Sequence, residues 1–339
     1  MIESLPKTLR APELYGYYWF NGEPVSVRES PGNVFLIDFF DYTSASCLRG
    51  IPYLKEWSEK YAEYGLVVIG VHTPEFRFGT EIENVRRAIE QQGIKYAVVC
   101  DNEGLMWNLF SATTRPTKFL VDKDGFIRVI HQGEGSYEQL ERQVQCLIAE
   151  AGIRGVFPDL TPPFSETDVP GSVCYRATAE VRTGYLHGAM GNTEGYNPES
   201  TLDYVDQGLY LQGRFYLAGK WLNERQLVRY EGEEGEEGYV SLRYQALEVN
   251  AVMHCPAANE RVFVKQDGEW LAEKDRGSDI LVGKDGATYV PIDRARMFNL
   301  VKNAEFGEHV VRLSTSATNF ELYTFSFATS PIPDVIPAN

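Results

Sequence analysis

The chain has 339 residues, of which 43% are hydrophobic and 24% are charged, a composition typical of a folded globular protein. This length exceeds that of one ordinary domain, so two domains are expected. The formal charge of −16 argues against nucleic acid or an anionic membrane as a partner, because both attract clustered Lys and Arg.

The termini and the cysteines exclude several further classes of protein. Residues 1–6 contain no apolar stretch of the kind found in signal peptides, and no apolar run approaches the ~20 residues of a membrane span. We therefore expect a cytoplasmic protein without a membrane span. The five cysteines are odd in number, widely scattered and without zinc-site spacing, which predicts neither a disulfide framework nor a metal site, and no cofactor is expected; they are Cys47, Cys100, Cys146, Cys174 and Cys255.

Residues 1–152 are predicted to form an α/β domain. Continuous apolar runs are typical of strands buried on both faces of a sheet, and they occur at 34–40, 66–71 and 97–99. Lys123-Asp124-Gly125 predicts a hairpin turn between strands at 118–122 and 126–130. Amphipathic spacing predicts helices at 52–64, at 82–92, around Trp107 and at 137–150. The order of these elements indicates a mixed central sheet covered by helices.

The second half of the chain follows a different pattern. Repeated prolines predict a linker over residues 153–180 that packs against one or both domains. Residues 181–330 contain alternating apolar and polar positions, which predict an all-β, jelly-roll-like sandwich, and residues 331–339 are expected to be a tail. Its clearest predicted strands are 239–246, 261–265, 308–314 and 320–327.

Several motifs connect the chain to a known family. Residues 12–142 resemble the TlpA-like redoxins, and most closely the thioredoxin-like domain of DipZ-type proteins. The resemblance is carried by Ala11-Pro12-Glu13-Leu14, Cys47-Leu48-Arg49, Gly70-Val71-His72-Thr73-Pro74-Glu75-Phe76, Pro116-Thr117-Lys118-Phe119 and Gly133-Glu134-Gly135. It implies a thioredoxin-like fold and an oxidoreductase acting on thiols and disulfides in cell redox homeostasis.

The resemblance continues into the second half of the chain. Thr178-Ala179-Glu180, Val249-Asn250 and Phe298-Asn299-Leu300-Val301 look like parts of the β-sandwich that follows thioredoxin in DipZ-type proteins. That sandwich resembles a carbohydrate-binding module, so a glycan is a possible partner of the second domain.

The family's Cys-x-x-Cys motif is incomplete, because Ser44-Ala45-Ser46-Cys47 stands in its place. The resemblance implies that Cys47 begins a helix, where the helix dipole and free N–H groups favour a thiolate, so we expect a lowered Cys47 pKa. Asp38 matches the family's buried acid, which relays a proton to this cysteine. Pro116 matches the cis-proline that faces the motif, and Arg115 replaces the usual aromatic residue and is expected to place a cation near Cys47.

Three functions are compatible with this motif. The first is monothiol chemistry, in which Cys47 forms a mixed disulfide with a small thiol or a client protein. Cys100 is the candidate resolving cysteine, although a buried strand cysteine is the simpler interpretation. Cys47 itself is alternatively a structural thiol, with Ser44 as a helix cap.

The second function is a peroxiredoxin-like thiol peroxidase. Ser44, Cys47 and Arg115 resemble the hydroxyl residue, the reactive cysteine and the arginine of peroxiredoxins. The third is a redoxin scaffold without turnover, joined to a sandwich that binds a sugar or a protein. Exposed aromatic rings would stack on such a sugar, whereas core packing is their ordinary role; the candidates are Tyr185, Tyr210, Tyr216, Trp221 and Trp270.

Overall fold

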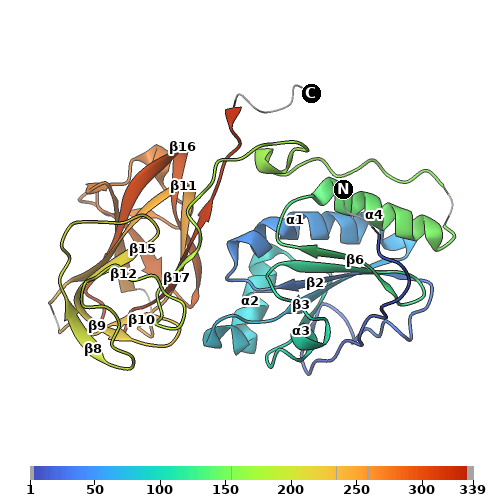
Figure 1. Ribbon diagram of the computed structural model, residues 1–339, viewed down its shortest axis with the longest axis horizontal. Coiled ribbons are helices and arrows are strands. Elements are labelled where there is room, and N and C mark those ends of the chain that lie inside the picture. The colour runs from blue at the N-terminus through green and yellow to red at the C-terminus, as the bar shows by residue number, and fades with distance from the viewer. Residues whose placement is uncertain (1–3, 154, 234, 258–259, 334–339) are drawn as a thin grey trace. The chain divides into compact units, whose positions relative to one another are not determined.

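The computed structural model describes residues 4–153, 155–233, 235–257 and 260–333, and it divides the chain into two compact units (Figure 1). These units are Met1–Ser172 and Val173–Asn339, and their boundary falls inside the predicted linker at residues 153–180. The first three residues and most of the predicted tail, from residue 334 onward, lie outside the described residues. In the described part of the chain, no helix has both the length and the apolar character needed to cross a membrane.

The first unit is built on a mixed sheet of six strands in the order β1-β4-β3-β2-β5-β6. The strands are β1 (Trp19–Phe20), β2 (Val34–Phe40), β3 (Leu66–His72), β4 (Ala97–Cys100), β5 (Thr117–Val121) and β6 (Ile127–Gln132). β2, β3 and β4 are parallel to one another, whereas β1, β5 and β6 pair antiparallel with their neighbours. The carboxyl ends of the three parallel strands therefore meet at one edge of the sheet.

Four α-helices complete this domain, namely α1 (Ala45–Lys60), α2 (Ile82–Gln92), α3 (Leu105–Leu109) and α4 (Tyr137–Glu150), with short 3₁₀ turns at Ala62–Tyr64, Arg77–Thr80 and Glu166–Asp168. Buried residues of α1, α2 and α4 form one core with the sheet, and α3 joins the core on the other face (Figure 1). The predicted α/β architecture is confirmed.

The first helix differs from its predicted bounds of 52–64. It begins at Ala45 and ends at Lys60, so Pro52 lies inside it and not at its start. Proline is favoured in the first turn of a helix, which is why the sequence placed the start there. The missing N–H of Pro52 is tolerated because Ile51, Leu54 and Trp57 bury the helix against the sheet.

Residues 155–172, which we call the covering segment, belong to the first unit and pack on its helices. The buried carboxylate of Glu141 on α4 accepts hydrogen bonds from the Thr161 backbone N–H at 2.8 Å and from the Tyr61 hydroxyl at 2.7 Å. The Lys60 ammonium lies 2.8 Å from the same carboxylate. The first part of the predicted linker is thus fastened to α1 and α4.

Replacing Glu141 by Gln is expected to lower the free energy of unfolding of the first unit by roughly 1–3 kcal/mol, because buried donors lose a charged acceptor. Glu138→Gln is the matched control, since Glu138 lies on the same helix but only forms an exposed pair with Arg142, worth about 0.2–0.5 kcal/mol. Urea-dependent labelling of the buried Cys47 thiol reports unfolding of this unit alone. Equal stability of the two variants would contradict this role of Glu141.

The second unit is all-β and contains an eleven-stranded, antiparallel hydrogen-bonded sheet. Its strands are β7 (Val181–Arg182), β8 (Thr201–Tyr204), β9 (Phe215–Asn223), β10 (Val228–Tyr230), β11 (Gly238–His254), β12 (Glu260–Gln266), β13 (Glu269–Trp270), β14 (Leu281–Val282), β15 (Thr288–Ile292), β16 (Arg296–Thr315) and β17 (Glu321–Ala328), with a 3₁₀ turn at Glu273–Asp275. β11 and β16 run together far beyond the predicted strands 239–246 and 308–314. Their alternation is interrupted by a register shift between Ala246 and Glu248, which explains why the sequence pattern stopped there.

The sheet of the second unit closes on itself around one hydrophobic core. β11 pairs first with β9 and then with β17, while β10 pairs with both β9 and β17. Trp221 and Tyr230 lie inside this circuit and are fully buried. The prediction of an all-β second domain is confirmed.

Candidate functional site

Cys47 lies in the first turn of α1, directly after the carboxyl end of β2, as the family resemblance implied. Ser44 is the N-cap residue, with an extended backbone at φ −94° and ψ 116°. Its side chain forms no capping hydrogen bond and instead lies 3.0 Å from the hydroxyl of Ser46. Cys47 is only 1% exposed, whereas Ser44 and Ser46 are half-buried.

A buried ion pair lies beneath this cysteine. Asp38 on β2 and Lys118 on β5 are direct cross-strand partners, and the Lys118 Nζ atom is 3.0 Å from the Asp38 Oδ1 atom. Both residues are 1% exposed. Asp38 occupies the place expected for the family's buried acid, whereas its partner Lys118 was not anticipated from the sequence. The available signal was a lysine in the middle of an apolar strand, Thr117–Val121, in which every residue is buried.

Burial raises the pKa of the Cys47 thiol to about 12, and the negative charge of Asp38 adds to this effect. The Ser44 hydroxyl and the Lys118 ammonium act in the opposite direction without reversing it. The expectation of a lowered Cys47 pKa was therefore wrong, because desolvation at this site exceeds the stabilising effect of the helix terminus. The resting thiol is protonated at neutral pH.

The same environment affects the other ionisable groups around Cys47. Burial raises the pKa of Asp38 despite the nearby Lys118 charge. Burial also raises the pKa of Tyr96, and the charges of Asp38 and Cys47 contribute to that shift. In the described part of the chain, neither the Tyr96 hydroxyl nor the Asp38 Oδ1 atom has a hydrogen-bond partner, although the latter is ion-paired. Asp38 thus combines a raised pKa with a position beside the thiol, and its Oδ1 atom faces the Lys118 ammonium.

The bond between Arg115 and Pro116 is cis, as predicted for the loop that faces the motif. The Ser46 hydroxyl donates a 3.4 Å hydrogen bond to the Arg115 carbonyl, which joins this loop to α1. The expectation that Arg115 supplies the cation near Cys47 was wrong. Its guanidinium donates to the Thr73 carbonyl at 2.9 Å and stacks 4.2 Å above the Trp107 ring, while Lys118 is the cation beside the thiol.

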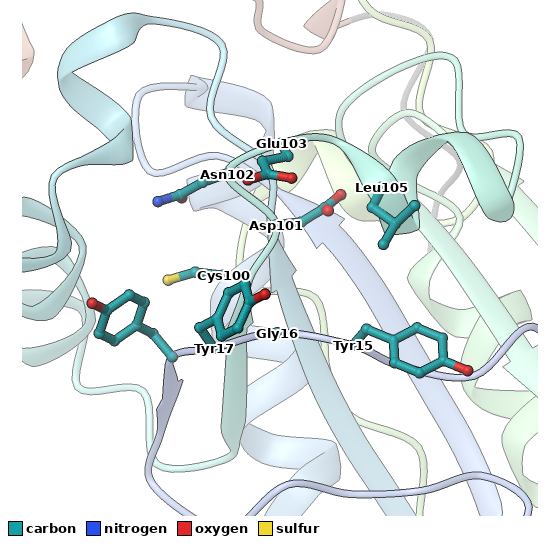
Figure 2. Close-up of a pocket in the computed structure, with 9 residues that line it drawn as sticks. Tyr15, Gly16, Tyr17, Cys100, Asp101, Asn102, Glu103 and Leu105 are labelled. Atoms are coloured by element: carbon teal, nitrogen blue, oxygen red, sulfur yellow. The ribbon is translucent and has the colours of Figure 1, made fainter.

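Cys100 lies at the end of β4, next to His72 on β3. It is 6% exposed, and burial raises its pKa to about 11. Both Cys100 and Cys47 are free thiols, so the structure contains no disulfide between them. Cys100 also borders a pocket lined by Tyr15, Gly16 and Tyr17 (Figure 2). Its predicted resolving role stays a prediction.

His72 has a structural environment. Its Nε2 atom lies 3.6 Å from Asp41 Oδ1, and its ring stacks on Tyr42. Burial opposes ionisation of Asp41, but His72 and the backbone N–H groups of Thr43 and Glu75 hold the pKa of that carboxyl below its usual range. Across the described residues, no group of three or more His, Cys, Asp and Glu side chains is arranged to hold a metal ion.

Iodoacetamide is expected to label Cys146 of the native protein rapidly at pH 7, because Cys146 is exposed, while Cys47 stays unlabelled. Alkylation requires the thiolate, so the Cys47 rate should rise about tenfold per pH unit from pH 7 to 9 without a plateau. Peptide mapping by mass spectrometry measures both rates. Labelling of Cys47 that levels off near pH 7 would contradict the raised pKa.

The aromatic candidates of the second unit are mostly structural. Trp221 and Tyr216 are buried, the Tyr185 hydroxyl donates to Glu199, and the Tyr210 hydroxyl donates to Asp206. Trp270 is the exposed member of the five, and its ring is occupied by the Lys265 ammonium at 4.4 Å. Core packing therefore explains Trp221 and Tyr216, whereas Tyr185 and Tyr210 are held by hydrogen bonds to carboxylates.

Comparisons with known proteins agree with this architecture. Residues 11–130 match the AhpC/TSA family model, and residues 178–328 match the model described as a thioredoxin like C-terminal domain. The protein DipZ of Mycobacterium bovis is 31% identical over 261 residues, which cover 72% of this chain and 35% of DipZ. The chain thus spans about a third of the length of that relative.

Two further relatives cover the first unit only. The thiol-disulfide oxidoreductase ResA of Bacillus cereus is 28% identical over 124 residues, covering 37% of this chain and 69% of ResA. The crystal structure of a putative thiol:disulfide interchange protein DsbE from Chlorobium tepidum is 23% identical, with a TM-score of 0.37, and covers 43% of this chain and 99% of that chain.

The first unit is accordingly a thioredoxin-like domain of the thiol-disulfide oxidoreductase family, and the second is the all-β domain that accompanies it. The similarity to DipZ covers 72% of this chain, which is more than either unit alone. The chain belongs to the DipZ/TlpA-type redoxins.

Proposed function

We propose that the first unit carries out thiol-disulfide exchange as a monothiol, with Cys47 as its reacting sulfur. The observation that carries the proposal is the position of Cys47, in the first turn of α1 beside the buried Asp38–Lys118 pair. The cis bond between Arg115 and Pro116 lies in the loop to which Ser46 is bonded. Thiol- or disulfide-bearing proteins and small thiols are the corresponding partners.

The proposed step begins with transfer of the Cys47 proton to Asp38. A carboxyl group with a raised pKa is a suitable acceptor for this proton, because burial has raised the pKa of both partners. The Cys47 sulfur then attacks one sulfur of an incoming disulfide, and the bond between the two substrate sulfurs breaks. A mixed disulfide with Cys47 forms, and the departing thiolate takes up the proton from Asp38.

Ser44 determines how the cycle ends. With a hydroxyl at this position, no neighbouring thiol can displace the bound substrate as it does in a Cys-x-x-Cys motif. A second thiol from solution must attack the mixed disulfide, which restores the Cys47 thiol and releases a new disulfide. The cycle is therefore expected to be slow and dependent on the concentration of free thiol.

Glutathione disulfide tests this proposal directly. A Cys146→Ser, Cys174→Ser protein removes the two more accessible thiols and is incubated with the probe at pH 8. The expected result is one adduct, mapped to Cys47 and reversed by free glutathione, that is lost in Cys47→Ser and slowed in Asp38→Asn. Absence of an adduct at Cys47 between pH 7 and 9, in protein shown to be folded, would reject monothiol exchange and favour a scaffold role.

Thiol peroxidase activity is the second candidate, since residues 11–130 match the AhpC/TSA family. A peroxiredoxin-like site needs the Arg115 cation beside the reacting thiol, but the Arg115 guanidinium donates to the Thr73 carbonyl and stacks on the Trp107 ring. Hydrogen peroxide is therefore expected to leave the Cys47 thiol titre unchanged on the time scale of the glutathione disulfide reaction. Rapid loss of that titre, prevented by Cys47→Ala, would support the peroxidase instead.

Two broader expectations accompany the proposal. Glycan binding by the second unit rests on the exposed Trp270, and loss of any measured binding in Trp270→Ala is the outcome that would support it. The expected cytoplasmic location stays a prediction.

A further inference from the structure

The first unit contains a second potential binding site, separate from the Cys47 thiol. A pocket of about 610 Å³ lies at the end of β4, between the segment that precedes β1 and the loop that leads into α3 (Figure 2). It is lined by residues 15–18, which we call the tyrosine segment, and by residues 100–103 and 105 at and after the end of β4. Its volume falls within the ~300–1,000 Å³ typical of ligand sites.

Gly16 allows the tyrosine segment to lie flat against the sheet. A Cβ atom at this position would come 2.2 Å from Val99 Cγ2, so any larger residue would force the two segments apart. The segment is also held by a 3.1 Å hydrogen bond from the Cys100 N–H to the Tyr18 carbonyl and by one of 3.2 Å from the Trp19 indole to the Gly16 carbonyl. The backbone beneath the pocket is therefore fixed before any ligand arrives.

Three aromatic side chains of this segment remain largely in water. Tyr17 is 97% exposed, Tyr15 is 56% exposed and Tyr18 is 54% exposed. Three exposed rings around a single hollow are uncommon on a monomer surface and are characteristic of binding surfaces. The faces of such rings carry negative electrostatic potential and attract cations.

The charged groups of the lining have the same preference. Glu103 is exposed and forms no ion pair with any described residue. Asp101 is buried, and its carboxylate already accepts hydrogen bonds from Thr73 and from the backbone N–H groups of Met106 and Trp107. The lining contains no Lys, Arg or His. The charges of the lining thus disfavour an anionic ligand, whereas a cation would be attracted by both the rings and Glu103.

We propose that this pocket binds a lysine or arginine side chain presented by an extended polypeptide segment of a partner protein. The guanidinium or ammonium group would lie against the tyrosine rings and pair with Glu103, and the volume leaves space for the adjoining backbone. The proposal requires no chemistry at Cys47, so it holds or fails independently of the proposed thiol exchange.

The probe is a capped hexapeptide of alternating Gly and Arg, and its binding to the full chain is measured by calorimetry. Its matched control replaces each Arg by citrulline, which keeps the shape and hydrogen bonds but removes the charge. We expect the arginine peptide to bind and the citrulline peptide to bind at least ~5-fold more weakly, with binding weakened by added salt.

Four variants locate the site. Tyr17→Ala is expected to lower the affinity by about 5-fold and Glu103→Gln by about 3-fold, while Tyr17→Phe keeps the aromatic face and retains binding. Glu63→Gln, an exposed acid elsewhere on the same unit, should have no effect. Equal binding of the two peptides, or an affinity unchanged in Tyr17→Ala and Glu103→Gln, would overturn the proposal. Absence of any binding up to millimolar peptide would do so as well.

Discussion

Replacing Ser44 by Cys is expected to produce a dithiol oxidoreductase that reduces insulin on the order of 100-fold faster than the parent protein. Residue 44 is the N-cap of α1 and is more accessible than Cys47. A thiol there would be desolvated less and would face the helix terminus, conditions that give a pKa near ~7 in redox motifs. At pH 7 the fraction of the new thiol present as thiolate would exceed that of Cys47 by a factor of about 10⁴ to 10⁵. A thiolate of lower pKa is also a weaker nucleophile, which halves the logarithm of this factor and leaves a gain on the order of 100-fold.

Two control variants separate a restored motif from a merely added thiol. Ser46→Cys places a thiol in the same turn, but beside Cys47 in sequence and not one helical turn away, so it should stay inactive. Ser44→Cys combined with Cys47→Ser should accumulate a stable mixed disulfide without turnover. If Ser44→Cys forms no disulfide with Cys47 under oxidising conditions, the site geometry no longer supports dithiol chemistry.

Breaking the Asp38–Lys118 pair is expected to cause the largest loss of stability of any single substitution considered for this chain. Lys118→Met leaves a buried carboxylate without its cation, and Asp38→Asn leaves a buried ammonium without its anion. Each should lower the free energy of unfolding of the first unit by roughly 3–5 kcal/mol. The double variant removes both charges and should recover most of the loss, because a buried pair replaced as a whole is often nearly neutral.

The pH dependence of Lys118→Met gives a sharper test. Burial raises the pKa of Asp38 in the folded state, so the destabilising effect of the unpaired carboxylate is absent when both states are protonated and grows as the pH rises above ~4. Urea-dependent labelling of Cys47 at pH 5 and pH 8, with a dithiodipyridine reagent that reacts with thiols at both pH values, measures this change. A loss of stability that is the same at both pH values would contradict a buried Asp38 carboxylate that depends on Lys118.

Much of the first unit could be predicted because its strands are buried on both faces. Runs such as residues 34–40 and 66–71 leave little choice of conformation, and the order of strands and helices then fixes the sheet. The second unit was predictable only in class. The predicted strands in β11 and β16 were cut short at Ala246 and Glu308, beside a register shift that moves the neighbouring side chains to the other face.

The candidate site was predictable in position but not in electrostatics. Motif matching located Cys47, Asp38 and Pro116, but the identity of a cation depends on which strands become neighbours, and only the pairing of β2 with β5 brings Lys118 to Asp38. The Cys47 pKa likewise depends on burial by residues from several elements, which the local sequence does not encode. Arg115 was misjudged for the same reason, because the Thr73 carbonyl that its guanidinium binds lies 42 residues away in the chain.

The covering segment determines where this protein can be divided. A fragment ending at residue 152, where the helical pattern of the sequence stops, would lose Thr161 from the Glu141 carboxylate and Asp168 from the Tyr53 hydroxyl. It would also lose the edge-to-face contact of Phe164 with the Tyr53 ring on α1. Such a fragment would present a newly uncovered aromatic surface to solvent and would tend to self-associate. A cut between Ser172 and Val173 keeps each half with its own interior, so we expect the first unit to fold by itself when the chain is divided there.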